Sequence, residues 1–265
     1  MKLLSAALFC TIGILPVCAN TIALEGSDAT AFHQDAVYTT QLFTYLGGAS
    51  LPVLVLGGVA LNAAVNPALY VLDPSYALPA NGLTAATLAA NYSAVYIESV
   101  GGCCTQADTS ITAAQETIIG AAEALGVNLG IENYGGGPAW GPILPAAVDA
   151  LPSSDFGGIT DFGTAGGPTC TDNEVVNAVG LAKGFIQPPV LGCYEHEGYM
   201  TSAFTALGFT SLFNADPAYF GANGSALLGT GTLSAGTPEP GTLMTMGVGL
   251  VGLAALLRRQ RAAKK

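Results

Sequence analysis

The stretch from residue 93 to residue 131 constrains the fold more than any other part of this chain. Residues 93–100 and 127–131 are mostly apolar and of strand length, and residues 112–125 between them repeat apolar side chains at helical spacing. Thr112 and Gln115 stand at capping-box spacing at the start of this helical stretch. A strand, a capped helix and a second strand in this order predict a βαβ unit of a parallel sheet.

The same alternation continues on both sides of this unit. Residues 51–58 are a continuous apolar run closed by glycines, which predicts a strand buried on both faces. Further strands are expected at residues 69–72, 189–193 and 209–213. Further helices are expected over residues 25–48 (capped at Ser27 or Asp28), 83–90, 143–151, 171–183 and 199–207. The predicted fold class is therefore α/β, with a mainly parallel sheet flanked by helices in three layers.

The order at residues 93–131 includes a glycine-containing loop, Gly101-Gly102, after the first strand and Gly126 after the helix. In this order the segment resembles flavodoxin-like domains, including the class I glutamine amidotransferase-like group. The resemblance implies a flavodoxin-like sheet, and it raises the question of a cysteine nucleophile at the carboxyl end of a strand.

Both ends of the chain have the composition of targeting segments. Met1-Lys2 is positive, residues 3–17 are apolar, and Val17-Cys18-Ala19 offers a cleavage site, so residues 1–19 predict a secretory signal peptide. A lipoprotein signal with Cys18 as its acylated residue is an open alternative.

Three parts follow one another at the C-terminus. Pro238-Glu239-Pro240 comes first, residues 242–257 then carry no charge, and residues 258–265 are basic. As a helix, the uncharged part would extend about 24 Å, which is short for a bilayer core of ~30 Å but workable with local thinning. The basic end should remain cytoplasmic.

These three parts, in this order, resemble the PEP-CTERM tails of bacterial exported proteins. The resemblance implies that an exosortase in the membrane recognises Pro238, Glu239 and Pro240 and removes the tail. The protein is then released or attached at the cell surface or in the extracellular matrix. Cargo of this family is typically linked to exopolysaccharide or biofilm production. An ordinary C-terminal membrane anchor is the alternative.

The expected organisation follows from these signals. Residues 1–19 are the signal peptide, residues 20–220 the exported α/β domain, residues 221–236 a linker rich in glycine, serine and threonine, and residues 237–265 the sorting tail.

The exported part is strongly acidic. Between Asn20 and Pro240 the only basic residue is Lys183, and there is no arginine. Such a domain cannot neutralise phosphates, so nucleic-acid binding is excluded. Divalent cations such as calcium, or a neutral matrix polysaccharide, are compatible partners, although an acidic surface also simply keeps an exported protein soluble.

Four cysteines remain after the signal peptide: Cys103, Cys104, Cys170 and Cys193. An even number in an exported chain predicts disulfides. Because a bridge between adjacent cysteines is strained, we expect Cys103 and Cys104 each to pair with Cys170 or Cys193, in an order that stays open.

The rival to these disulfides is a cysteine-dependent hydrolase. Cys103 or Cys104 would be the nucleophile, with His196 and Glu197 completing a triad. The amidotransferase-like pattern has glycines around a single cysteine and a His-x-Glu pair, whereas this chain has Gly-Gly-Cys-Cys and Glu-His-Glu. We therefore expect a non-enzymatic protein. No spacing indicates a metal site or another cofactor, and calcium binding by acidic loops is left open.

Overall fold

The computed structural model describes residues 20–57, 60–73, 83–99, 111–132, 140–152, 154–158, 174–187, 197–215 and 221–230. The predicted signal peptide, the four cysteines that follow it, His196 and the sorting tail lie outside these residues. Within them, no helix has the length and apolar character needed to cross a membrane.

One half of the sheet is parallel, as the βαβ pattern predicts. Its strands lie in the order β3-β2-β4-β5-β1. Their bounds are β1 Ile22–Glu25, β2 Val53–Leu56, β3 Tyr70–Asp73, β4 Ala94–Ile97 and β5 Asn128–Glu132. All neighbouring pairs in this half run parallel, so their carboxyl ends meet at one edge of the sheet.

The other half is antiparallel. β10 pairs antiparallel with β1, and β8 and β9 both pair antiparallel with β10. The shorter strands β6 and β7 extend this half by pairing antiparallel with β8 and β9. Bounds are β6 Phe156–Gly158, β7 Val175–Val176, β8 Glu197–Met200, β9 Phe209–Asn214 and β10 Gly224–Thr230. The α/β class is confirmed in the form of a mixed sheet with flanking helices, and the expectation of a mainly parallel sheet is wrong for this half.

β10 also corrects the expected linker. Residues 224–230, although rich in glycine and serine, are all buried, and they lie in the middle of the sheet between β1 and β9. Leu227 and Leu228 point to opposite faces and join different apolar clusters. A Cβ on Gly229 would lie 2.2 Å from Tyr45 Oη, so a larger residue there would require the Tyr45 side chain to move. The remaining residues of that expected linker, 231–236, lie outside the described part.

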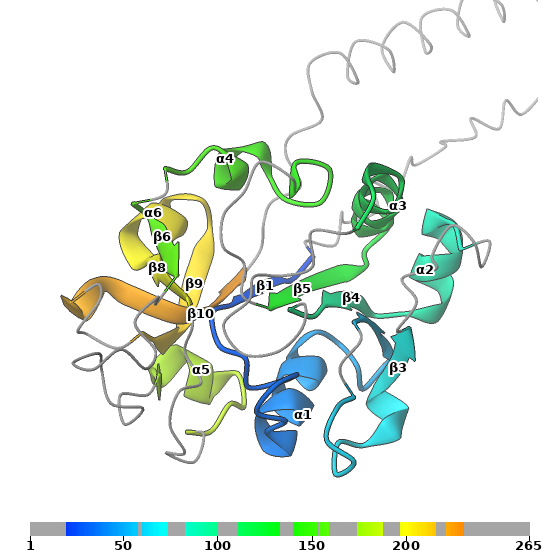
Figure 1. The fold of residues 1–265 in the computed structure, drawn as a ribbon, viewed down its shortest axis with the longest axis horizontal. Helices are drawn as coiled ribbons and strands as arrows, with labels where there is room; N and C mark the ends of the chain where they lie inside the picture. Colours follow the sequence, from blue (N-terminus) through cyan, green and yellow to red (C-terminus); the bar gives the residue numbers. More distant parts are fainter. Residues whose placement is uncertain are drawn as a thin grey trace, which may run out of the picture. The chain divides into compact units, whose positions relative to one another are not determined.

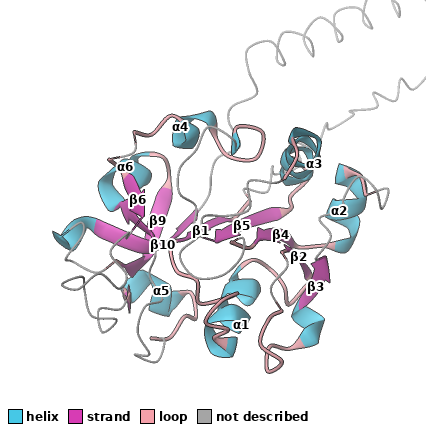
Figure 2. Cartoon of the chain, in the orientation of Figure 1, coloured by secondary structure: helices cyan, strands magenta, loops and turns pink. Residues whose placement is uncertain are grey.

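Helices cover both faces of the sheet (Figures 1 and 2). One apolar cluster joins the sheet to α2, α3, α4 and α6, and the other joins it to α1 and to Phe185, which follows α5. Bounds are α1 Ala36–Tyr45, α2 Ala85–Asn91, α3 Ala113–Glu123, α4 Ala146–Asp149, α5 Ala178–Ala182 and α6 Thr201–Ala206, with short 3-10 turns η1 Pro67–Leu69 and η3 Gly221–Asn223. Successive residues of β2 alternate between the two clusters, which explains why the strand is continuously apolar.

The capping box of α3 is confirmed. Thr112 Oγ1 accepts from the Gln115 main-chain N–H at 3.3 Å, and Gln115 Oε1 accepts from the Thr112 main-chain N–H at 2.7 Å. Gly126 then adopts φ of 101°, the left-handed conformation that ends a helix most easily at glycine.

Two expected helices begin more than a helical turn later than predicted. α1 starts after Asp35, whose carboxylate caps Val37 and Tyr38, and not at Ser27 or Asp28; residues 26–35 lead from β1 to this helix. α5 starts after Asn177, because Val175 and Val176 pair with β9. At Val175 and Val176, strand pairing over a long sequence distance overrides a local helical pattern.

Candidate functional site: a buried carboxyl cluster

Three glutamates lie where neighbouring parallel strands end. Glu25 closes β1, Glu132 closes β5, and Glu98 directly follows β4. Glu25 and Glu132 are in register on adjacent strands, so their side chains leave the sheet on the same face. All three side chains are 0% exposed. This edge is where open α/β sheets carry their ligand sites.

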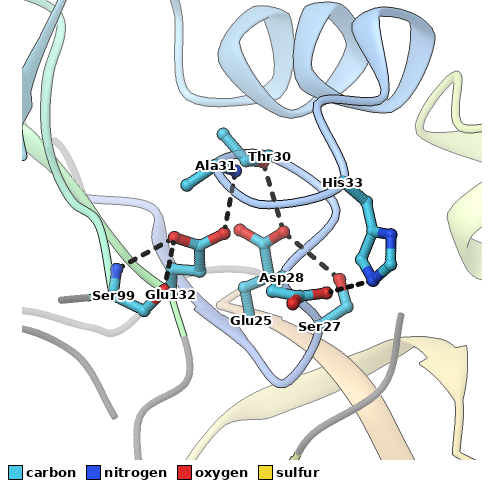
Figure 3. A network of polar contacts seen from close by, with 8 residues as sticks. All are labelled: Glu25, Ser27, Asp28, Thr30, Ala31, His33, Ser99 and Glu132. Carbon is cyan, nitrogen blue, oxygen red and sulfur yellow. Dashed lines mark hydrogen bonds and ion pairs between the residues drawn. The ribbon is translucent and has the colours of Figure 1, made fainter. Parts of the chain in front are cut away.

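The chain that leaves β1 covers this edge. We call residues 26–31 the strap, and all six of them are buried. Ser27 Oγ and Thr30 Oγ1 each donate to Glu25 Oε1 at 3.3 Å. The Ala31 main-chain N–H donates to Glu132 Oε1 at 3.1 Å (Figure 3). The strap therefore contacts both members of the in-register pair.

The two glutamates have different kinds of partner. Glu25 accepts from hydroxyls, including Tyr96 Oη at 2.5 Å. Glu132 accepts from main-chain N–H groups, with Ser99 N at 2.9 Å from Oε2 and the Ser99 hydroxyl at 3.3 Å. A hydroxyl can donate or accept, whereas an N–H only donates. Glu25 thus tolerates a proton easily, and Glu132 is better equipped to hold a negative charge.

Burial shifts both carboxyls toward the neutral form. Burial, followed by repulsion from Glu132, raises the pKa of Glu25 well above 4.5, and the Tyr96 hydrogen bond opposes this. Burial also raises the pKa of Glu132 to about 8, although the N–H groups of Ser99 and Ala31 lower it. The N–H partners of Glu132 thus oppose the rise of its pKa. Because burial outweighs them, the cluster holds protons at neutral pH, and Glu25 holds its proton more firmly than Glu132.

Two glycines make room for this arrangement. A Cβ on Gly57, just after β2, would lie 1.7 Å from Glu98 Oε2. A Cβ on Gly26 would lie 2.1 Å from the main-chain oxygen of Glu197. Glycine is therefore required at both positions by close approach.

Glu197, a member of the predicted triad, opens β8. Its main-chain N–H donates to the Gly26 oxygen at 2.8 Å, so β8 continues along β10 from the point where β1 ends. Burial raises the pKa of its carboxyl to about 9. Its proposed partners Cys103, Cys104 and His196 lie outside the described residues, as do Cys170 and Cys193. The triad and the disulfides stay predictions.

The described residues contain no group of three or more histidine, cysteine, aspartate or glutamate side chains arranged to hold a metal ion. Paired carboxyls with different proton affinities do perform acid–base catalysis in other proteins. Such groups must reach a substrate. Here the strap donates hydrogen bonds to both of them, so in this conformation they form a polar core.

The sequence analysis did not predict that Glu25, Glu98 and Glu132 form a cluster. The three share one sequence feature, a glutamate that directly follows two uncharged residues at the end of a predicted or observed strand. The segments are Ala23-Leu24-Glu25, Tyr96-Ile97-Glu98 and Gly130-Ile131-Glu132. Recognising it requires knowing that all three runs are parallel strands of one sheet.

Comparison with known families identifies the C-terminal segment. A family model described as the PEP-CTERM protein-sorting motif matches residues 236–260. The chain carries a PEP-CTERM sorting motif. The match contains Pro238, Glu239 and Pro240 and the uncharged residues 242–257, so the exosortase-sorted character expected from these residues is confirmed. No curated protein and no solved structure matches the chain.

Proposed function

We propose that this PEP-CTERM chain is an exosortase-processed protein of the cell surface or extracellular matrix, with a non-enzymatic α/β domain associated with exopolysaccharide. The observation that carries the proposal is the sorting motif at residues 236–260. This motif implies export, transient anchoring in the membrane and recognition by exosortase.

The chemistry of the domain supports a non-enzymatic role. The carboxyls at the carboxyl edge of β1 and β5 are buried and accept hydrogen bonds from the strap. With Lys183 as the only basic residue between Asn20 and Pro240, the domain suits a neutral polymer better than a phosphorylated or anionic ligand.

The decisive measurement is mass spectrometry of the mature protein's C-terminus, isolated from exosortase-containing cells. We expect the tail from Gly241 onward to be absent. Replacing Pro238, Glu239 and Pro240 together by alanine should leave the tail in place. Thr245→Ala, which keeps the motif and the uncharged span, should be processed normally. An intact Lys265 on cell-associated protein would show that the tail is an ordinary anchor.

The role of the domain is tested on the mature protein. We expect it to co-sediment with purified matrix polysaccharide and to show four blocked cysteines in a thiol titration. Free thiols, together with activity lost in folded Cys103→Ser or Cys104→Ser, would favour the cysteine hydrolase. Heat released on adding calcium alone would favour a calcium-binding module.

A further inference from the structure

We propose that the strap is a proton-dependent cover, which stays closed over the carboxyl edge of the parallel strands while Glu25 and Glu132 are protonated and opens as Glu132 loses its proton. Opening uncovers the part of an open α/β sheet where ligands bind.

The strap is placed to sense this proton. It donates three hydrogen bonds to the pair, from Ser27, Thr30 and Ala31. Because Glu25 and Glu132 are in register on adjacent strands, a charge on one is felt directly by the other. Moving the strap away would remove these three hydrogen bonds from the pair.

The groups that face the pair are acids and phenols. Glu25 faces Glu132, Tyr96 of β4, Tyr38 of α1 and Glu174 just before β7. Glu132 faces Glu98 and Asp28. Asp28 lies on the strap itself, and its Oδ1 is 3.3 Å from His33 Nε2. The single lysine of the domain, Lys183, is exposed at the end of α5. No lysine or arginine between Asn20 and Pro240 is thus available to balance a negative charge on Glu132 or Glu25.

The direction of the pH effect follows from linkage. The pKa of Glu132 is about 8 when the strap is closed and returns toward 4.5 when the carboxyl meets water. The closed state is therefore fully favoured below pH 4.5 and loses its advantage as the pH rises toward 8. In this window the opening constant rises by up to tenfold per pH unit, and it levels off above pH 8 for this group.

Hydrogen exchange of the mature protein between pH 5 and 9 tests the proposal. We expect the protection factor of the Ala31 amide, corrected for the intrinsic exchange rate, to fall at least tenfold between pH 6 and 8. At every pH it should be lower than that of Leu129 in β5. Equal protection of the strap and β5 throughout would mean that the strap opens only by global unfolding, and this would overturn the proposal.

Two variants separate the strap from general stability. In Glu132→Gln, the protection factor of the Ala31 amide should no longer fall between pH 6 and 8, even if its absolute value differs from that of the wild type. Glu123→Gln is the matched control, because burial raises the pKa of Glu123 to about 8 as well. Its main-chain oxygen accepts from Asn20, before the amino end of β1 and away from the strap. This control should keep the wild-type profile of Ala31. An unchanged profile in folded Glu132→Gln contradicts the proposal.

Discussion

Glu25 and Glu132 are the same residue type at equivalent positions of adjacent strands, yet their hydrogen-bond partners make them chemically different. Three hydroxyls surround Glu25. Two main-chain N–H groups point at Glu132. The same substitution should therefore have unequal consequences at the two positions.

We predict that Glu25→Gln changes the free energy of unfolding at pH 7 by less than about 1 kcal/mol, because the hydroxyls can turn to accept from the amide. Glu132→Gln should cost about 1–3 kcal/mol, because one N–H then faces an NH₂ group and stays unsatisfied in the interior. Urea denaturation of the two variants measures both values. Equal losses would show that partner type is not what distinguishes the glutamates.

β10 and β1 show how an element depends on its surroundings. β1 is a short strand at the start of a stretch with helical periodicity, and β10 has the composition of a linker. Neither would be stable alone. β10 becomes a strand because β1 and β9 pair with its two edges and apolar side chains cover both of its faces.

We predict that Leu228→Ala lowers the free energy of unfolding by about 2–5 kcal/mol, as expected for a fully buried leucine that leaves a cavity. Leu125→Ala is the control, since Leu125 is 58% exposed, and its effect should stay within about 0.5 kcal/mol. Urea denaturation at pH 6 compares the two. A loss as small in Leu228→Ala as in Leu125→Ala would contradict the central position of β10.

At the scale of the whole molecule, the distribution of charge sets the response to pH. Burial raises the pKa of Glu123, Glu132 and Glu197 to values between about 8 and 9, and it raises that of Glu25 as well. Each of these groups favours the folded state most below its unfolded pKa, and this contribution is lost as the pH rises through the folded pKa.

We therefore predict a domain that is most stable in mild acid and weakens between pH 5 and pH 9. Each group contributes at most about 1.4 kcal/mol per pH unit to the slope. Thermal unfolding of the mature protein across this range gives the measurement. A melting temperature that is constant, or that rises with pH, would contradict the protonated state of the buried glutamates.

Features that depend on near neighbours in the chain could be predicted from the sequence alone. The capping box of α3, the strands of the βαβ unit and the sorting motif at residues 236–260 are of this kind. In each, the residues that define the feature are close together in the sequence, so spacing and composition carry the information.

The antiparallel half and the carboxyl cluster come from contacts between distant residues. The main-chain N–H of Ile22 donates to Thr230 Oγ1 at 2.7 Å across 208 positions, and β1 pairs with β5 more than a hundred residues away. Strand pairing at this distance brings Glu25, Glu98 and Glu132 to one edge and buries them. The sequence by itself determines the sorting motif and predicts four strands of the parallel half, β2 to β5. The tertiary structure determines which acids meet, because their environment forms only when β5 and β10 have paired with the two edges of β1.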